Sequence, residues 1–270
     1  MSRQVDTERY DNIWRGWEDV SPAPTRFAQH REGRARFLTA LERQLVQVQP
    51  SRVLEVGCGS AIDLAILAER ISGVHVFGMD ISAEALRIAR THLASVRGRF
   101  GLCRGDICAL PFTDGTFRMV FSQGVLEHFR DPSAAVQEQV RILADGGILV
   151  INVPQRLTGY TLHKWRAIRR GTWPWGWETA YSAAELLAMG RAHGLQSLEC
   201  FGEEYWRAWG EPSWVLRDLY GKLHRRNPLA RFTPFPQLDQ FYNRLWANLE
   251  ERYGHLFLRN VVAVFQKPRG

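Results

Sequence analysis

A glycine-rich turn between Leu54 and Ala61 is the segment of this chain best suited to hold a charged small molecule. It has the sequence Leu-Glu-Val-Gly-Cys-Gly-Ser-Ala, and Gly57 and Gly59 allow a sharp turn and close approach of the backbone to a ligand. A helix is expected to begin directly after it, with free N–H groups that attract negative charge. The segment therefore predicts a binding turn for an anionic group.

Two classes of ligand compete for this turn. A dinucleotide fingerprint requires a third glycine, which would fall at position 62, where the chain has Ile62. Glu55 would also be an unfavourable neighbour for a pyrophosphate. A cofactor with an amino-acid end fits better, because its carboxylate can use backbone donors and its ammonium can use acidic or carbonyl oxygens.

Short apolar runs predict the strands that position this turn, and helical patterns separate them. Because the runs are continuously apolar, they are typical of a parallel α/β sheet that is buried on both faces. Ser60 with Asp63 resembles a capping box, Ser82 is expected to cap a second helix, and Asp131 with Pro132 marks a third helix start. The predicted strands cover residues 52–57, 74–79, 100–103, 117–122 and 148–153.

The alternation breaks after Pro154. A capping box at Ser182 and Glu185 opens a helix to about residue 193, and residues 195–201 and 260–265 predict the last two strands. The stretch between these strands is too long for a plain loop, so a mostly helical cap is expected there. Before the first strand, one amphipathic helix is expected over residues 27–48.

Five segments in register resemble the motifs of class I S-adenosylmethionine-dependent methyltransferases of the small-molecule type, including those of ubiquinone biosynthesis. The first is the Glu-x-Gly-x-Gly turn, and the second is Asp80 at the end of the second predicted strand. The others are residues 105–112, 117–128 and 145–151. The resemblance is good over residues 35–155 and looser over 180–202 and 255–266. Ala61 departs from it, since many members have a third glycine there.

This resemblance implies a doubly wound Rossmann-like fold with seven strands in the order 3-2-1-4-5-7-6, the last strand antiparallel. It implies S-adenosyl-L-methionine as cofactor and S-adenosyl-L-homocysteine as product. In the family the acid at the position of Asp80 accepts both ribose hydroxyls, while Asp106 and Ile107 match the adenine-binding turn. The implied cofactor-binding residues are Glu55, Gly57, Cys58, Gly59, Asp80, Ile81, Asp106, Ile107, Ser122 and Gln123.

His128 follows the fourth predicted strand, at the edge of the sheet where ligands of such folds bind. A histidine there could take the proton of an acceptor hydroxyl as methyl transfer begins. Leu-Glu-His is common in this superfamily without a base role, however, which favours a structural role. Some ubiquinone-type O-methyltransferases bind a metal through Glu-x-x-Glu-His. Here Gly124 replaces the first glutamate, so no metal is predicted.

The flanks of the predicted cofactor scaffold differ from it in charge and in aromatic content. Residues 52–151 carry 10 arginines against 11 acidic residues, whereas the rest carries 25 basic against 17 acidic residues and all ten tryptophans. The basic, Trp-rich stretch 156–177 could form a lid over the acceptor, a contact with an anionic membrane, or simple cap packing. The aromatic residues expected to line the acceptor pocket are Tyr10, Trp14, Tyr160 and Tyr181.

Several classes of protein are disfavoured. No apolar run is long enough to span a membrane, no secretory leader is visible, and Cys58, Cys103, Cys108 and Cys200 make no zinc or C-x-x-C spacing, which favours a cytoplasmic protein. The sequence Ser-Gln-Gly-Val at 122–125 is not the type used by amino-methylating nucleic-acid enzymes. The expected organisation is an N-terminal arm (1–50), a cofactor-binding core (51–154), a lid insertion (155–181), more core (182–202), a cap (203–255) and a last strand (256–270).

The function that we expect is methyl transfer from S-adenosylmethionine to a small organic acceptor, in the first place at oxygen. Alternatives are action on a lipid or quinone at a membrane surface and a non-catalytic cofactor-binding protein. A nicotinamide oxidoreductase is disfavoured by Ile62. The sequence does not define the oligomeric state.

Overall fold

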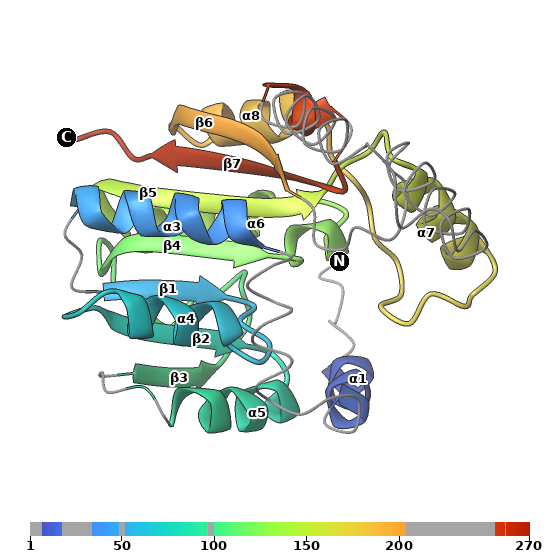
Figure 1. Ribbon diagram of the computed structural model, residues 1–270, viewed down its shortest axis with the longest axis horizontal. Coiled ribbons are helices and arrows are strands. Elements are labelled where there is room, and N and C mark those ends of the chain that lie inside the picture. The colour runs from blue at the N-terminus through green and yellow to red at the C-terminus, as the bar shows by residue number, and fades with distance from the viewer. Residues whose placement is uncertain are drawn as a thin grey trace, which may run out of the picture.

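The computed structural model describes residues 7–17, 34–48, 52–94, 96, 100–203, 252–256 and 258–270. Within these residues seven strands form a sheet in the order β3-β2-β1-β4-β5-β7-β6 (Figure 1). The strands are β1 (Arg52–Val56), β2 (His75–Asp80), β3 (Phe100–Arg104), β4 (Phe117–Gln123), β5 (Leu143–Pro154), β6 (Gln196–Glu203) and β7 (Asn260–Gln266).

The pairing of the strands confirms the predicted topology. Strand β1 runs parallel to both β2 and β4, and β5 runs parallel to β4. Strand β7 is antiparallel to β5 and to β6. All of the parallel strands therefore end at one edge of the sheet, the carboxyl edge, where ligands of doubly wound sheets bind.

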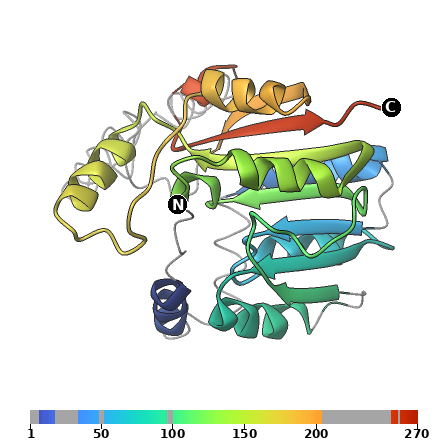
Figure 2. The ribbon, with the colours of Figure 1, turned by 180° about the vertical axis from the view of Figure 1, so that it is seen from behind.

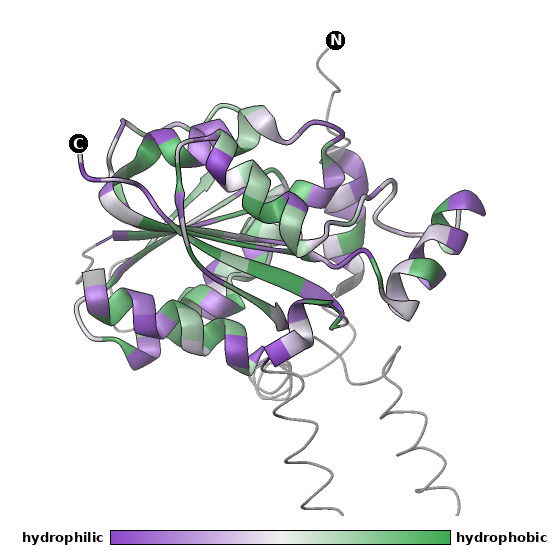
Figure 3. Ribbon diagram, turned by 90° about the horizontal axis from the view of Figure 1, so that it is seen from above, coloured by the Kyte–Doolittle hydropathy of each residue, from purple (hydrophilic) through white to green (hydrophobic). Residues whose placement is uncertain are grey.

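Helices cover both faces of the sheet (Figures 1, 2 and 3). Helices α3 (Ala35–Val48), α4 (Ile62–Arg70) and α5 (Ala83–Leu93) pack on one face, where Phe37, Leu41 and Leu45 of α3 are buried. Helices α6 (Ser133–Ile142) and α8 (Ala183–Ala192) cover the other face. Burial of these apolar side chains is the main stabilising contribution and fixes the carboxyl edge in place.

Two helices lie beyond the carboxyl edge rather than on a face: α1 (Thr7–Trp17) and α7 (Gly159–Arg169) (Figure 1). Helix α1 corrects the expectation of a single helix before the first strand. Its apolar residues Tyr10, Ile13, Trp14 and Trp17 recur at three- and four-residue spacing, so the signal was present in the sequence. The cap expected over 203–255 lies almost entirely outside the described residues, as does the first part of the helix expected over 27–48.

Candidate cofactor and acceptor site

The glycine turn after β1 has the tight backbone that the sequence predicts. Gly57 and Gly59 both have positive φ, at 69° and 50°. A Cβ at Gly57 would lie 2.3 Å from Val125 Cγ2, and one at Gly59 would lie 2.6 Å from the ring of Trp14. Side chains are therefore excluded at both positions by conformation and by space.

Ala61, where many family members have glycine, also adopts the left-handed conformation, with φ at 53°. Helix α4 consequently begins at Ile62, with Ala61 as its N-cap and no side-chain cap hydrogen bond, so the capping box expected at Ser60 and Asp63 is wrong. The Asp63 carboxylate pairs instead with Arg34, with Asp63 only 2% exposed. Two other predicted starts are confirmed: Ser82 caps α5, and Ser182 with Glu185 forms a complete capping box on α8. The start expected at Asp131 and Pro132 is shifted by one residue, since Pro132 is the N-cap of α6 and Asp131 accepts a hydrogen bond from Ser133 N.

Asp80 braces the glycine turn from the end of β2. Its Oδ2 accepts a hydrogen bond from Gly59 N at 2.8 Å, and its Oδ1 accepts one from Ser82 N at 2.9 Å. Burial raises the pKa of this carboxyl, while these backbone hydrogen bonds work in the opposite direction. Each carboxylate oxygen retains capacity to accept a further hydrogen bond, so the geometry leaves room for a ligand hydroxyl.

Glu55 lies beneath the turn in a small ionic cluster. It is 4% exposed, and its Oε2 has no hydrogen-bond partner in the described structure. Burial, and then the charge of Asp63, raises the pKa of Glu55, whereas Arg34 lowers it. Arg34 Nη1 also donates to Gln123 Oε1 at 2.6 Å, which brings Gln123 into the same cluster. The unpartnered oxygen of Glu55 suits the ammonium of an amino-acid ligand.

The remaining predicted cofactor residues differ in their burial and in their hydrogen bonds. Asp106 is exposed and accepts from Cys108 N at 2.9 Å, so its carboxylate serves its own turn, while Ile107 is buried beside it. Burial raises the pKa of the Cys58 thiol well above its ordinary value, which indicates a packing residue. Ile81 is half-buried and its carbonyl accepts from Arg104 Nε at 2.9 Å.

Unpartnered buried polar atoms gather at the carboxyl edge of β1, β4 and β5. Buried polar groups of folded proteins nearly always have partners, so such a concentration points to a ligand. Asn152 belongs to this set although the sequence analysis missed it; a lone amide inside the apolar run of β5 was the available signal. Among the described residues the set comprises Glu55 Oε2, Ser122 Oγ, Glu127 Oε2, His128 Nδ1 and both side-chain polar atoms of Asn152.

Helix α1 closes over this edge. Asp11 Oδ1 accepts from Ser82 Oγ at 2.5 Å, which fastens the helix to the start of α5. The ring of Trp14 lies against Gly59, and the ring of Tyr10 meets that of His128 edge-on at 5.6 Å between centroids. The N-terminal arm thus brings two of the four predicted acceptor-side aromatics to the end of β1 and β4.

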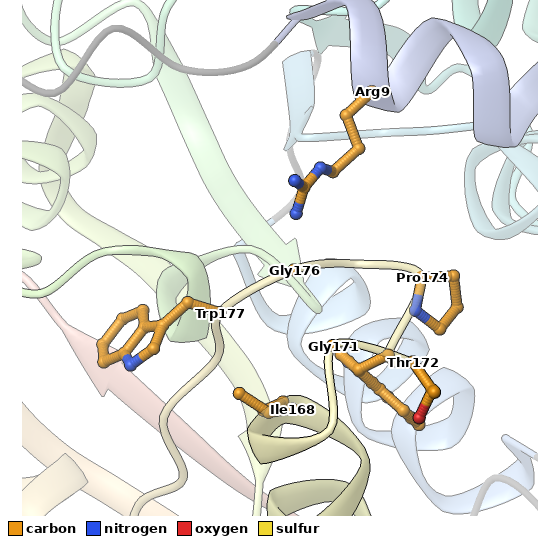
Figure 4. A pocket seen from close by; sticks show the side chains of 8 residues that line it. Arg9, Ile168, Gly171, Thr172, Pro174, Gly176 and Trp177 are labelled. Carbon is orange, nitrogen blue, oxygen red and sulfur yellow. The ribbon is translucent and has the colours of Figure 1, made fainter.

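The stretch after α7 completes an aromatic roof with α1. Trp175 lies 6.3 Å from both Tyr10 and Trp14 between ring centroids. Arg9 reaches from α1 toward this stretch, where Trp173 and Trp177 help to line a cavity of about 520 Å³ (Figure 4). Helix α1 and the stretch after α7, which are far apart in the sequence, therefore contribute to the walls of one cavity.

The other two predicted aromatics lie at the sides of this roof. The hydroxyl of Tyr181 donates a hydrogen bond to Leu126 O at 3.3 Å. Leu126 is the first residue of the short 3-10 helix η1 (Leu126–His128). Tyr160 stacks edge-on with Trp173 at 6.1 Å and lies under the guanidinium of Arg259 at 3.7 Å. Tyr181 therefore supports η1, whereas Tyr160 ties α7 to the segment before β7.

A buried ionic cluster joins η1 to the lid. Lys164 Nζ lies 3.0 Å from Glu178 Oε2 and donates to Thr179 O at 3.1 Å, and the Lys164 side chain is 0% exposed. Trp173 Nε1 donates to Glu178 Oε1 at 2.7 Å. Glu178, the first acid after the basic stretch, and Lys164 were not singled out in the sequence. Their pairing offsets part of the cost of burying both charges.

His128 lies beside this cluster, at the end of η1. Burial lowers the pKa of His128, although the nearby Glu178 charge and hydrogen bonds with the backbone of Trp177 and Gly124 raise it. Its Nδ1 is buried and has no geometrically defined hydrogen-bond partner in the described structure. A histidine has the chemistry of a general base, and this side chain follows the end of strand β4, next to the proposed acceptor space.

Comparisons with known proteins agree with this arrangement. Residues 54–151 match the family model described as a methyltransferase domain. The chain is 32% identical over 167 residues to ubiquinone biosynthesis O-methyltransferase of Thiobacillus denitrificans, covering 57% of this chain and 68% of that protein. It is 30% identical over 159 residues to trans-aconitate 2-methyltransferase of Azoarcus sp., covering 59% and 58%.

The match to curated relatives is partial in length, and solved structures support the fold. The chain spans less than two thirds of several of these relatives, for example 46% of a demethylmenaquinone methyltransferase from Thermus thermophilus. Magnesium protoporphyrin IX methyltransferase from Synechocystis, solved with bound S-adenosylhomocysteine, has a TM-score of 0.60 at 15% identity and covers 98% of this chain and 100% of its own. The motifs, the sheet and the relatives agree: the chain belongs to the class I S-adenosylmethionine-dependent methyltransferases.

Proposed function

We propose that this protein transfers the methyl group of S-adenosylmethionine to an oxygen of a small organic acceptor. The observation that carries the proposal is the set of unpartnered buried polar atoms at the ends of β1, β4 and β5, under the roof formed by α1 and residues 171–177. Buried polar groups of folded proteins normally have partners, so this set favours a site that a ligand completes. The oxygen acceptor is also supported by the O-methyltransferase among the relatives.

The cofactor would be held mainly by the glycine turn and the end of β2. Glu55 would receive its ammonium, and Asp80 would accept from its ribose hydroxyls. The N–H groups of Gly57, Cys58 and Gly59 already donate to Met79 O and to Asp80 Oδ2, so the N–H of Ser60 is the donor of this turn that we assign to its carboxylate. Asp106 and Ile107 would face its adenine, as the resemblance implies. For Asp106 this requires that its carboxylate share its present hydrogen bond with Cys108 N.

The bound cofactor supplies an electrophilic methyl group on a sulfonium, so the protein has to align the acceptor and exclude water. Tyr10, Trp14 and Trp175 would do this from above. His128 would take the proton of the acceptor hydroxyl at its unpartnered Nδ1, because its lowered pKa keeps the imidazole neutral near pH 7.

A second setting for the acceptor, a lipid surface, is favoured by one feature of the lid. Helix α7 and the residues before it expose large apolar side chains, with Leu157 75%, Leu162 48% and Trp165 41% exposed. Arg166, Arg169 and Arg170 lie on the same segment. Exposed apolar and basic residues together suit an anionic bilayer. No helix among the described residues is long and apolar enough to cross a membrane.

A turnover assay tests the proposal directly. The fold alone does not define the reaction, since a structure described as a [4+2]-cyclase has a similar fold, with a TM-score of 0.58 at 22% identity. The full chain should convert S-adenosylmethionine to S-adenosylhomocysteine in the presence of phenolic acceptors. With His128 as base, kcat/KM should rise with pH to a plateau, with a midpoint below 6.5. His128→Gln should abolish this acid limb. If no acceptor is methylated, the protein is a binding protein or catalyses another reaction.

A further inference from the structure

Glu127 is a buried acid that has no role in the mechanism proposed above. It lies in η1, directly after the end of β4, and is 4% exposed. Its Oε2 has no hydrogen-bond partner in the described structure. An unpartnered carboxylate oxygen destabilises a folded protein, since it loses its hydration and gains nothing in return. A carboxyl kept at such a cost needs an explanation.

Lys164, the buried lysine of the cluster, does not compensate the charge of Glu127. Lys164 is occupied by the carboxylate of Glu178 at 3.0 Å and by Thr179 O at 3.1 Å. Burial, and then the charge of Glu178, raises the pKa of Glu127 to about 8, and Lys164 only moderates this effect. The cluster therefore contains two acids for one lysine, and Glu178 is the acid whose bonds are complete.

The surroundings of Glu127 are those of the proposed acceptor space. Its backbone carbonyl accepts from Thr179 N at 2.9 Å, which joins η1 to the lid. The neighbouring His128 is in edge-on contact with Tyr10. Besides burial, the charge of Glu127 raises the pKa of Tyr10, Tyr160 and Tyr181, three of the four aromatics predicted to line the acceptor pocket.

We propose that Glu127 is an acceptor-binding residue that receives a hydrogen bond from a second donor group of the acceptor, next to the hydroxyl that is methylated. The proposal rests on the proposed function. It narrows the acceptors to molecules with two neighbouring donors, one facing His128 and one facing Glu127. The second donor is a hydroxyl or an ammonium, because either can complete a carboxylate oxygen.

Thermal unfolding of the protein without ligands gives the first test, which needs no knowledge of the acceptor. At pH 9, where this carboxyl is ionised, Glu127→Leu and Glu127→Gln should both raise the Tm, by about 2–4 °C, because they remove or neutralise an unpartnered carboxylate. Glu178→Gln is the matched control from the same cluster. It should lower the Tm, because it weakens the pairing of buried Lys164. A lower Tm in both Glu127 variants would overturn the proposal, since Glu127 would then be a satisfied structural residue.

The dependence of this Tm difference on pH sharpens the test. The pKa of Glu127 is raised in the folded state, so the folded protein holds a proton that the unfolded chain releases between about pH 4.5 and 8. Its contribution to stability is therefore lost as pH rises through this interval. The titratable groups that interact with the charge of Glu127 are Glu178, Lys164, Tyr10, Tyr160 and Tyr181. The Tm advantage of Glu127→Gln should thus be larger at pH 9 than at pH 6, and an equal advantage would contradict the assignment.

Kinetics with matched phenols gives the second test. Wild type should show a KM at least tenfold lower for catechol or 2-hydroxybenzylamine than for phenol, and Glu127→Leu should remove this preference with S-adenosylhomocysteine affinity unchanged. Glu127→Gln should keep the preference for catechol, because the amide oxygen can still accept a hydrogen bond from the second hydroxyl. It should lose the preference for 2-hydroxybenzylamine, because the amide has no charge to pair with the ammonium. Loss of cofactor binding, or a preference unchanged in Glu127→Leu, would overturn the role. Absence of all turnover with the raised Tm intact would instead refute the proposed function.

Discussion

The two halves of the carboxyl edge are built from different parts of the polypeptide. The half that we propose for the cofactor, called the cofactor half, consists of the glycine turn, the end of β2 and residues 105–107. Backbone groups organise it, such as Gly59 N, which donates a hydrogen bond to Asp80. The acceptor half consists of η1, α1 and residues 159–181, and it is organised by side chains that meet across long sequence separations, such as Tyr10 with His128. A cofactor site of this kind can be recognised in the sequence from one short turn. The acceptor site cannot, because its side chains come from segments that meet only in the folded chain.

The largest effect is expected from a side chain added to the cofactor half. In Gly57→Ala the new Cβ would lie 2.3 Å from Val125 Cγ2, at a φ of 69°. We expect a loss of about 2–4 kcal/mol in the free energy of unfolding, measured by denaturant titration, together with loss of S-adenosylhomocysteine binding.

Gly73→Ala is the matched control for Gly57→Ala. Gly73 also has positive φ, at 80°, but no atom lies within 4 Å of the added Cβ. It should therefore show only the strain of the left-handed conformation, about 1–2 kcal/mol, with cofactor binding retained. Equal effects of the two substitutions would mean that the turn has no special steric requirement.

The next largest effect is expected at Asp80, where a substitution should change the affinity for the cofactor and leave the acceptor half intact. Asp80→Ala removes a carboxylate that holds Gly59 N and Ser82 N and that would accept from the ribose. We expect S-adenosylhomocysteine to bind about 10–100-fold more weakly by calorimetry, since hydrogen bonds to charged groups contribute about 1.5–3 kcal/mol each. Asp80→Asn, which retains an acceptor oxygen, should lose less. Unchanged affinity in the alanine variant would limit Asp80 to bracing the turn.

Trp14 tests whether the two halves are separable in function. Trp14→Ala removes the ring that lies on Gly59 and 6.3 Å from Trp175. Turnover should fall about tenfold, because the acceptor is less well aligned and shielded, while S-adenosylhomocysteine affinity changes by less than threefold. The exposed Trp165 provides the control, and Trp165→Ala should leave soluble turnover unchanged. A parallel loss of cofactor affinity in Trp14→Ala would make α1 part of the cofactor half.

The smallest effect concerns the outer surface of the lid. If α7 contacts a bilayer, the protein should co-sediment with vesicles containing anionic lipid at low salt and be released at high salt. Replacing Arg166 and Arg169 by glutamine should reduce the bound fraction severalfold, with turnover of a water-soluble acceptor preserved. No binding at low salt would restrict the lid to a soluble acceptor.

The sequence predicted the cofactor half better than the acceptor half, for a physical reason. The strands and the turn at Gly57 and Gly59 follow from apolar runs and from local backbone geometry, whereas the order of the sheet was implied by the family resemblance. The pairing of Lys164 with Glu178 and the contact of Trp14 with Gly59 depend on segments that meet only in the folded chain. Even within the cofactor half, the N-cap of α4 was wrong, because a left-handed Ala61 replaced the expected side-chain cap.

The roles of the individual site residues remain predictions, and their evidence also differs between the halves. Glu55 and Ser122 gained support from unpartnered buried atoms, as did His128. Asp106 gained none, because its carboxylate serves its own turn. Asn152, buried and unpartnered at the end of β5, entered the site from the structure alone.

Isothermal titration calorimetry of the full chain tests the central claim most directly, that the carboxyl edge is a site for an adenosyl amino acid. S-adenosylhomocysteine should bind at one site per chain, and NAD should give no heat of binding under the same conditions. The unpartnered oxygen of Glu55 adds a specific expectation: Glu55→Leu should weaken binding of S-adenosylhomocysteine much more than binding of adenosine, which lacks the ammonium. Binding of NAD, or of neither molecule, would contradict the account.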